Sequence, residues 1–364
     1  MIGIADPEFG EAEQAAAKRV LESGRVADGP EVRAFESEFA TVCETDHAVA
    51  TANGTAALVA ALDGLGIGDG DRVVTTPFSF VASSNAVRLV GAEPVFADID
   101  PRTYNLDPDA ARSAVRETDA DAILAVHLYG LPAEMAALSD IATEEDVFLI
   151  EDAAQAHGAR YQGQPVGSFG DAAAFSFYPT KNMTTGEGGM VVTDDEAVAE
   201  RARCFINHGR DADGGPYAHE RVGHNLRMTS LAAAIGREQL AKLPAWVEQR
   251  RYHAAVLSNG LDDVPGIEPP AEPSDAHHAY HQYTVRCDDR SGLRERLEAG
   301  GVGAAVYYPK PIHRLEAYEE YDATAPAAEA AAESVLSLPV HPGLTADEID
   351  HVVETVSEAG LQVQ

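Results

Sequence analysis

Lysine is scarce in this chain, and one lysine lies in a segment that could carry chemistry. Only four of the 364 residues are lysines, and Lys181 follows the run Phe175-Ser176-Phe177-Tyr178-Pro179-Thr180. A second run, Thr184-Thr185-Gly186-Glu187-Gly188-Gly189, comes shortly after it. Because a lysine amine can form a Schiff base with a carbonyl group, Lys181 is our first candidate catalytic residue.

A carboxylate upstream suits the same chemistry. The apolar run 147–150 predicts a buried strand that ends in Glu151-Asp152-Ala153-Ala154-Gln155. A carboxylate at the carboxyl end of such a strand is placed to meet a ligand. Pyridoxal phosphate chemistry needs a lysine amine for the Schiff base and an acid that keeps the pyridine nitrogen protonated. Lys181 and Asp152 are the candidates for these two roles.

Two further segments could hold other parts of a planar phosphorylated cofactor. Residues 53–58, Asn-Gly-Thr-Ala-Ala-Leu, follow a predicted strand and open a helix, whose N-terminus attracts phosphate. The alternative is a capped helix without a ligand. Residues 76–80, Thr-Pro-Phe-Ser-Phe, end the next strand, so an aromatic ring there could lie on the cofactor or simply belong to the core.

Other patterns predict less. The glycines of 64–70 close a helix and lead into a strand, the reverse of the order in a dinucleotide-binding fingerprint. His277, His278 and His281 lie in a strand-like pattern, which predicts an exposed strand edge rather than a metal site. Glu151 and Asp152 are adjacent strand residues that point to opposite faces and cannot share a metal. We predict no metal site.

Alternating strand and helix patterns must position these residues. Strands are predicted at 73–76, 94–97, 122–126, 147–150, 172–175 and 190–193, with helices at 55–65, 80–90 and 133–145. This rhythm predicts an α/β fold with a mostly parallel central sheet. Past residue 243 a long helix to about 259, a proline-rich stretch and a strand at 280–286 indicate a second unit. We predict a large domain, 1–244, that includes a helix at 8–22, and a smaller α+β domain, 245–364.

The acidic composition bears on partners and habitat. Against 60 acidic residues stand 26 basic ones, and the net charge of −34 disfavours nucleic-acid binding. A cationic partner could explain the charge, and so could a surface adapted to concentrated salt. The acids are spread over many segments without one block, which favours the salt-adapted, halophilic explanation.

The remaining composition points to a cytoplasmic protein. Cys43, Cys204 and Cys287 are far apart, without the spacing of a disulfide framework or a zinc site. The N-terminus has no basic segment followed by an apolar one, and no stretch approaches about 18 apolar residues. We therefore expect no signal peptide, no membrane span and a reducing compartment.

Five segments together resemble the DegT/DnrJ/EryC1/StrS family of sugar aminotransferases. They are residues 53–58, 76–80, 151–158, 176–182 and 223–228, and their order and spacing agree over nearly the whole chain. The resemblance implies the aspartate aminotransferase fold (type I), a homodimer with active sites at the subunit interface, and nucleotide-linked keto sugars as substrates. It also implies residue roles. Lys181 is expected to form the Schiff base, and Asp152 to pair with the pyridine nitrogen. Gln155 is expected beside the ring hydroxyl, and Phe80 is expected to stack on the ring. The phosphate is expected to be held by Gly54, Thr55, Ala56 and Ser176, and by Asn225 of the other subunit.

Substrate expectations follow from the same resemblance. Residues 307–313, Tyr-Tyr-Pro-Lys-Pro-Ile-His, are similar to a family segment near the sugar site, so Tyr308 and His313 are candidate substrate contacts, although a proline-braced turn is the alternative. Glu187 is a third candidate, because its run resembles that of members that aminate C4 of the sugar. One departure is Asn53, where many members carry serine.

The resulting hypothesis is an aminotransferase that moves an amino group from glutamate or glutamine to a 4-keto nucleotide sugar. Lys181 is expected to be the base that moves the proton of the donor's α-carbon. Two alternatives remain: a non-catalytic regulatory protein on the same fold, and a transaminase of a cyclitol or another keto compound without a nucleotide.

Overall fold

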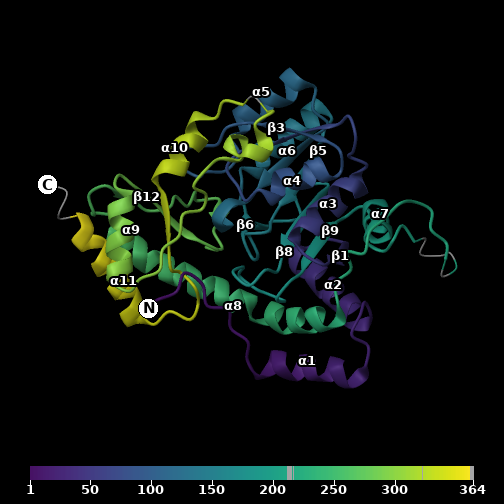
Figure 1. Cartoon of the computed structure of the whole chain (residues 1–364), viewed down its shortest axis with the longest axis horizontal. Helices are drawn as coiled ribbons and strands as arrows, with labels where there is room; N and C mark the ends of the chain where they lie inside the picture. The colour runs from purple at the N-terminus through teal and green to yellow at the C-terminus, as the bar shows by residue number, and fades with distance from the viewer. Residues whose placement is uncertain (211–214, 216, 322, 361–364) are drawn as a thin grey trace.

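The computed structural model describes residues 1–210, 215, 217–321 and 323–360 (Figure 1). Its centre is a seven-stranded sheet in the order β1-β9-β8-β5-β4-β2-β3. Strand β9 runs antiparallel to both of its neighbours, and the other pairs are parallel. The strands are β1 His47–Thr51, β2 Arg72–Thr75, β3 Glu93–Phe96, β4 Ala122–Val126, β5 Phe148–Asp152, β8 Ala172–Ser176 and β9 Gly189–Thr193.

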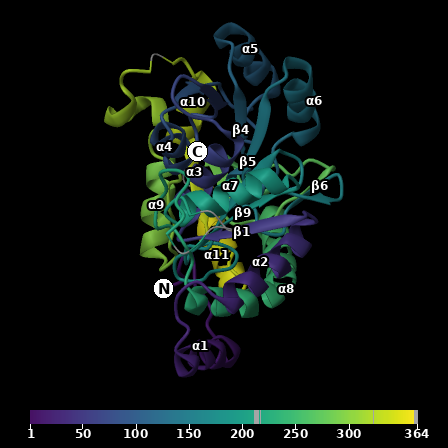
Figure 2. The ribbon, with the colours of Figure 1, turned by 90° about the vertical axis from the view of Figure 1, so that its right-hand side faces the viewer.

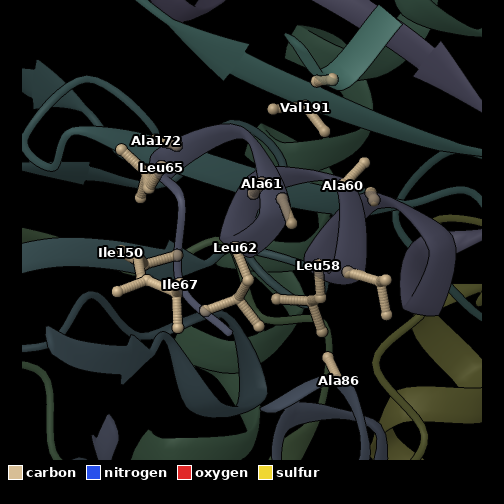
Figure 3. Close-up of a cluster of buried hydrophobic side chains, with 14 of the residues drawn as sticks. Leu58, Ala60, Ala61, Leu62, Leu65, Ile67, Ala86, Ile150, Ala172 and Val191 are labelled. Atoms are coloured by element: carbon tan, nitrogen blue, oxygen red, sulfur yellow. The ribbon is translucent and has the colours of Figure 1, made fainter. Parts of the chain in front are cut away.

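Helices cover both faces of this sheet, because both faces of its strands are apolar. On one face α3 (Gly54–Leu65), α4 (Ala82–Leu89) and α7 (Glu196–Ile206) bury a cluster that includes Leu58, Leu62 and Ile150 (Figure 3). On the other, α2 (Pro30–Cys43) packs with α8 (Ser230–Leu261), while α5 (Pro108–Thr118) and α6 (Met135–Glu145) cover the end near β2 and β4. In Figure 2, α5 and α6 lie near β4 at the upper end of the sheet, and α2 and α8 lie near β1 at its lower end.

The C-terminal part has its own core around an antiparallel sheet of β10 (Ile267–Glu268), β12 (Tyr283–Cys287) and β13 (Val335–Leu338). Helices α9 (Arg290–Ala299) and α11 (Ala346–Gly360) pack on each other, and α10 (Pro326–Ser334) precedes β13. A small third sheet joins β6 (Arg160–Tyr161), β7 (Gln164–Pro165) and β11 (Ala276–His277). Single 3-10 turns lie at Leu128–Gly130, Ile312–Arg314 and Glu316–Tyr318.

Helix α8 (Ser230–Leu261) is the element that runs through both parts (Figure 1). We predicted a long helix that begins past residue 243, and this start is wrong, because Pro244 lies inside the helix. Packing of the first half of α8 against α1 (Glu11–Ser23) and α2 holds the helix together on the N-terminal side of the proline. The proposed division at residues 244 and 245 therefore falls within a helix that belongs to both parts.

The C-terminal part also reaches back over the sheet through residues 307–321 and 323–329. Asp98, just past β3, accepts hydrogen bonds from the backbone N–H groups of Ala327 (2.9 Å) and Ala328 (3.0 Å) in the first turn of α10. Ile312 N–H donates to the Pro77 carbonyl at 2.7 Å. This segment, which we call the strap (residues 307–321 and 323–329), thus lies on the carboxyl ends of β2 and β3.

Candidate active site

A cavity of about 1040 Å³ opens where β5 and β8 end and α3 begins. Parallel strands place their last residues along one edge of the sheet, and this edge is where α/β folds bind ligands. Ten of the predicted site residues line this cavity: Gly54, Thr55, Ala56, Phe80, Asp152, Gln155, Ser176, Lys181, Glu187 and Tyr308.

Two predicted residues lie elsewhere. His313 is buried in the strap, where its Nε2 lies 3.0 Å from a carboxylate oxygen of Glu329. Asn225 is exposed and forms a backbone bridge with Asn207, although its neighbours His224 and Leu226 do line the cavity. The expected contact of Asn225 with a phosphate belongs to a second subunit and stays a prediction.

Asp152 is the last residue of β5 and is only 5% exposed. Its Oδ2 accepts the hydroxyl hydrogen of Ser83 at 2.7 Å, and its Oδ1 accepts the N–H of Ala154 at 3.2 Å. Burial raises the pKa of this carboxyl, whereas the two hydrogen bonds and the positive charge of Lys181 act in the opposite direction. Asp152 is thus an anchored acid that can face a cation in the cavity.

Lys181 extends into the same cavity from the turn after β8. Burial lowers the pKa of its amine to about 8, and the nearby negative charge of Asp152 offsets part of that effect. An amine with such a pKa is present in part as the free base at neutral pH. It can therefore act as a nucleophile and carry a proton.

Gln155 is held from both sides. Its Oε1 accepts the backbone N–H of Tyr129 at 2.8 Å, and its Nε2 donates to the hydroxyl of Tyr308 at 3.0 Å. Tyr308 belongs to the strap, and the hydroxyl of Tyr129 donates to the carbonyl of Tyr307 in that strap. The orientation of the Gln155 amide therefore depends on the C-terminal part.

The start of α3 offers a cradle for an anion. Asn53 caps this helix, since its Oδ1 accepts the N–H of Ala56 at 2.9 Å. A side chain at Gly54 would place its Cβ 2.6 Å from the Cβ of Ser176, so only glycine lets the two segments approach this closely. Thr55 and Ser176, which both carry a hydroxyl, line the cavity beside the positive end of the helix. The asparagine that departs from the family pattern thus performs the capping role.

Glu151 points away from the cavity, as we predicted for adjacent strand residues. It is fully buried and accepts N–H groups of Gly167, Phe169 and Gly170 at 2.7 to 2.9 Å. His127 Nδ1 accepts the N–H of Ala133, so its Nε2 carries the hydrogen that is donated to Glu151 at 2.9 Å. These bonds lower the pKa of Glu151 despite burial and fix the strand end that carries Asp152.

The histidines near position 280 correct our interpretation of an exposed strand edge. His278 and His281 are buried, and His281 lines the cavity. The segment leaves β11 and is held by N–H groups of Ala279 and Gln282, which donate to carbonyls of the turn at 128–130. Burial and the charge of Lys181 hold the pKa of His281 well below its usual range, so it is a neutral imidazole.

Sequence reasoning also missed Ser83 and Tyr129. Ser83 lies 69 positions before Asp152, and Tyr129 lies 26 positions before Gln155. No local pattern marks either residue, because serine in a short helix and tyrosine in a turn are common. Only the lateral order of β2, β4 and β5 brings them to the site.

The residues present fit pyridoxal phosphate. The cavity joins an amine for the aldehyde, a carboxylate for the ring nitrogen, an aromatic face on Phe80, and a helix N-terminus where glycine leaves room for phosphate. In the described part of the chain, no group of three or more His, Cys, Asp or Glu side chains could hold a metal ion. No helix among the described residues is long and apolar enough to cross a membrane.

This fold and site define a class, the aminotransferases that use a lysine and an aspartate around one cofactor. The DegT/DnrJ/EryC1/StrS aminotransferase family model matches residues 7–357. The chain belongs to this family, which is dependent on pyridoxal phosphate. Our predictions of the family, of the fold, of an aminotransferase and of the cofactor are thereby confirmed.

Individual relatives cover almost the whole chain. The dTDP-3-amino-3,4,6-trideoxy-α-D-glucose transaminase of Streptomyces venezuelae is 43% identical over 94% of this chain and 91% of that protein. A pleiotropic regulatory protein of Geobacillus stearothermophilus is 39% identical over 93% of this chain and 92% of its own length. The crystal structure of DesV from S. venezuelae superposes with a TM-score of 0.93 at 42% identity, over 97% of this chain and 95% of DesV.

Proposed function

We propose that this protein transfers an amino group from glutamate or glutamine to a nucleotide-linked keto sugar, with Lys181 as the residue that binds the cofactor covalently. The observation that carries the proposal is that Lys181 and Asp152 open onto one cavity beside the Gly54 cradle. A relative named as a nucleotide-sugar transaminase supports the class of substrate.

Each residue of the site has a task in this proposal. Pyridoxal phosphate, when bound, supplies an aldehyde and a ring that takes up an electron pair when a C–H bond breaks. The Nζ of Lys181 would accept the proton from the α-carbon of the amino donor and deliver it to the aldehyde carbon of the cofactor, which suits an amine with a pKa of about 8. Asp152 holds a proton on the ring nitrogen through its negative charge. Thr55, Ser176 and the N–H groups of α3 bind the phosphate.

The position that receives the amine needs a direct test. The run that contains Glu187 resembles that of members acting at C4, which favours a 4-keto sugar, and Glu187 lies exposed on the cavity wall. The name of the S. venezuelae relative instead places an amino group at C3. We retain C4 as the proposal, and paired assays with 3-keto and 4-keto nucleotide sugars decide between them.

The proposal includes a cytoplasmic homodimer. Some apolar side chains that line the cavity are exposed, and Leu89 (66% exposed) and Tyr178 (48% exposed) are among them. A second subunit would cover these side chains and bring Asn225 to the phosphate. Analytical ultracentrifugation measures the oligomeric state, and high salt is the suitable condition for a protein with such an acidic surface.

The first experiment is the visible absorption spectrum of purified protein with pyridoxal phosphate, before and after glutamate or glutamine is added. We expect a lysine-bound cofactor band that disappears with a donor. Lys181→Ala should keep its fold and lose at least about 10³-fold in turnover, because both the covalent link and the proton carrier are gone. A Lys181→Ala protein that transaminates at the normal rate would refute the assignment.

A regulatory role is the alternative that one relative's name supports. It predicts a protein whose bound cofactor no amino donor alters. A transaminase of a cyclitol is the other alternative, and a requirement for the nucleotide on the acceptor excludes it.

A further inference from the structure

The Asp152 carboxylate has a hydrogen-bond partner, Ser83, that has no part in the proposed reaction so far. Ser83 lies in the first turn of α4, is 1% exposed, and contacts Oδ2 of Asp152 at 2.7 Å. An ionised carboxylate only accepts hydrogen bonds, so the hydroxyl of Ser83 must be the donor. The positive end of α4 adds to the attraction for the carboxylate.

Three acceptors compete for the hydroxyl hydrogen of Ser83. Ser83 has one hydroxyl hydrogen, and its possible acceptors are Asp152 at 2.7 Å, the Phe80 carbonyl at 3.3 Å and Ser79 Oγ at 3.0 Å. Asp152 Oδ2 receives this hydrogen, because it is the nearest of the three acceptors and hydrogen bonds to ionised groups are stronger than those to neutral ones. Ser79 then donates to Ser83, and a chain of two hydroxyls points at Asp152.

We propose that Ser83 is a positioning residue that keeps the Asp152 carboxylate ionised and turned towards the ring nitrogen of the cofactor. The inference rests on the proposed function, since it assigns Ser83 a part in how the site holds that nitrogen. Without the Ser83 hydroxyl the carboxylate becomes more basic, and the proton shared with the ring nitrogen moves towards Asp152. The ring then attracts the electron pair of the breaking C–H bond less strongly.

Other groups that face Asp152 do not replace Ser83. Lys181 approaches from the turn after β8, His127 from the end of β4, and Tyr308 from the strap. The Nε2–H of His127 is already donated to Glu151, and the hydroxyl of Tyr308, which accepts from Gln155, makes no hydrogen bond with Asp152 among the described residues. Lys181 is required for the reaction itself. Ser83 is therefore the side chain whose hydroxyl is committed to the Asp152 carboxylate.

The chain contains a matched control. Ser84 is the next residue of the same helix, is fully buried, and has an Oγ without a hydrogen-bond partner among the described residues. Ser84→Ala therefore removes the same atom from the same helix and does not touch Asp152. Ser83→Thr keeps the hydroxyl, and Ser83→Cys replaces it with a weaker donor.

The test is ¹⁵N nuclear magnetic resonance of protein loaded with pyridoxal phosphate labelled at the ring nitrogen. We expect the Ser83→Ala signal to move towards unprotonated pyridine, the Ser83→Cys signal to move less, and the Ser83→Thr and Ser84→Ala signals to match the wild type. The rate constant of the half-reaction with glutamate should fall about ten-fold in Ser83→Ala, with little change in the apparent affinity for glutamate. Melting temperatures of the cofactor-free proteins show whether each variant folds.

The outcomes separate this inference from the proposed function. A wild-type signal in Ser83→Ala or Ser83→Cys overturns the inference, and so does a shift of equal size in Ser84→Ala. If Ser83→Ala does not fold, the Ser83→Cys and Ser83→Thr pair still decides. A wild-type protein that binds the cofactor but reacts with no donor refutes the proposed function, whatever the nitrogen signals show.

Discussion

The two polar contacts expected for the cofactor ring are built in different ways. Asp152 is anchored entirely within the large sheet and its helices, through the Ser83 hydroxyl and the N–H of Ala154. Gln155 is anchored partly by Tyr308, which the strap brings from 153 positions away. We call Asp152 with its partners Ser83 and Ala154 the Asp152 end of the site, and Gln155 with its partners Tyr129 and Tyr308 the Gln155 end. The Asp152 end is thus fixed within one core, whereas the Gln155 end depends on how the C-terminal part lies on the sheet.

This difference separates chemistry from substrate contact. The proton on the ring nitrogen must be held through both halves of a transamination, which favours a rigid support. The strap also carries Tyr307, which lines the cavity, so the Gln155 end lies where an amino donor must be exchanged for a keto sugar. Damage at the Asp152 end should therefore slow the chemical steps, and damage at the Gln155 end should weaken substrate use.

The largest effect is expected at Asp152. Asp152→Asn removes the negative charge that opposes the ring cation, so the half-reaction with glutamate should slow by about 10² to 10³-fold while the cofactor still binds. Stopped-flow absorbance measures this rate. Asp107→Asn also removes a carboxylate, at the start of α5 and outside the cavity, and should react like the wild type. A half-reaction of normal speed in Asp152→Asn would show that the charge of Asp152 does not support the chemical step.

The pH dependence of cofactor incorporation at Lys181 tests the Asp152 end without the transfer reaction. In cofactor-free protein the amine is mostly protonated below a pKa of about 8, so the rate of cofactor incorporation should rise as pH passes through this value. Because the charge of Asp152 raises the pKa of Lys181 against the effect of burial, Asp152→Asn should move the midpoint to lower pH. An unchanged or higher midpoint would show that the two groups are not coupled.

Tyr308→Phe probes the Gln155 end. The change leaves the Nε2 of Gln155 without its acceptor, and kcat/KM for the keto sugar should fall about five- to ten-fold. The ring-nitrogen signal should stay as in the wild type. Tyr321→Phe is the matched control, since Tyr321 lies in the same strap but outside the cavity, and its hydroxyl has no hydrogen-bond partner in the part of the chain that the structure describes. A shifted nitrogen signal in Tyr308→Phe would show that the two ends are not separate.

Sequence alone could predict one end better than the other. Strand periodicity and the rule for carboxyl ends of parallel strands place Asp152, and the segment around Lys181 supplies the amine. Ser83 could not be found this way, because its contact depends on the lateral order of strands far apart in the chain. His281 was assigned to an exposed edge for the same reason, since local alternation says nothing about packing across the two parts. The start of α8 was missed because Pro244 suggests a boundary that tertiary packing overrides.

The smallest effect is expected where the strap meets the sheet. Asp98→Ala removes the acceptor for the first turn of α10, so it should cost about 1 kcal/mol of stability and lower the melting temperature by about 2 °C. Asp107→Ala is the matched control, because Asp107 caps α5 through Ala110 N–H, and α5 packs on the large sheet. Differential scanning calorimetry should give similar losses for the two variants.

Only Asp98→Ala should loosen the strap, and a double-mutant cycle with Tyr308→Phe detects this. If the cap on α10 helps to hold Tyr308 against Gln155, the effects of Asp98→Ala and Tyr308→Phe on kcat/KM for the keto sugar are less than additive. Asp107→Ala and Tyr308→Phe should add. Additive effects in both pairs would mean that Tyr308 is held by its immediate contacts alone, and the Gln155 end would then be as self-contained as the Asp152 end.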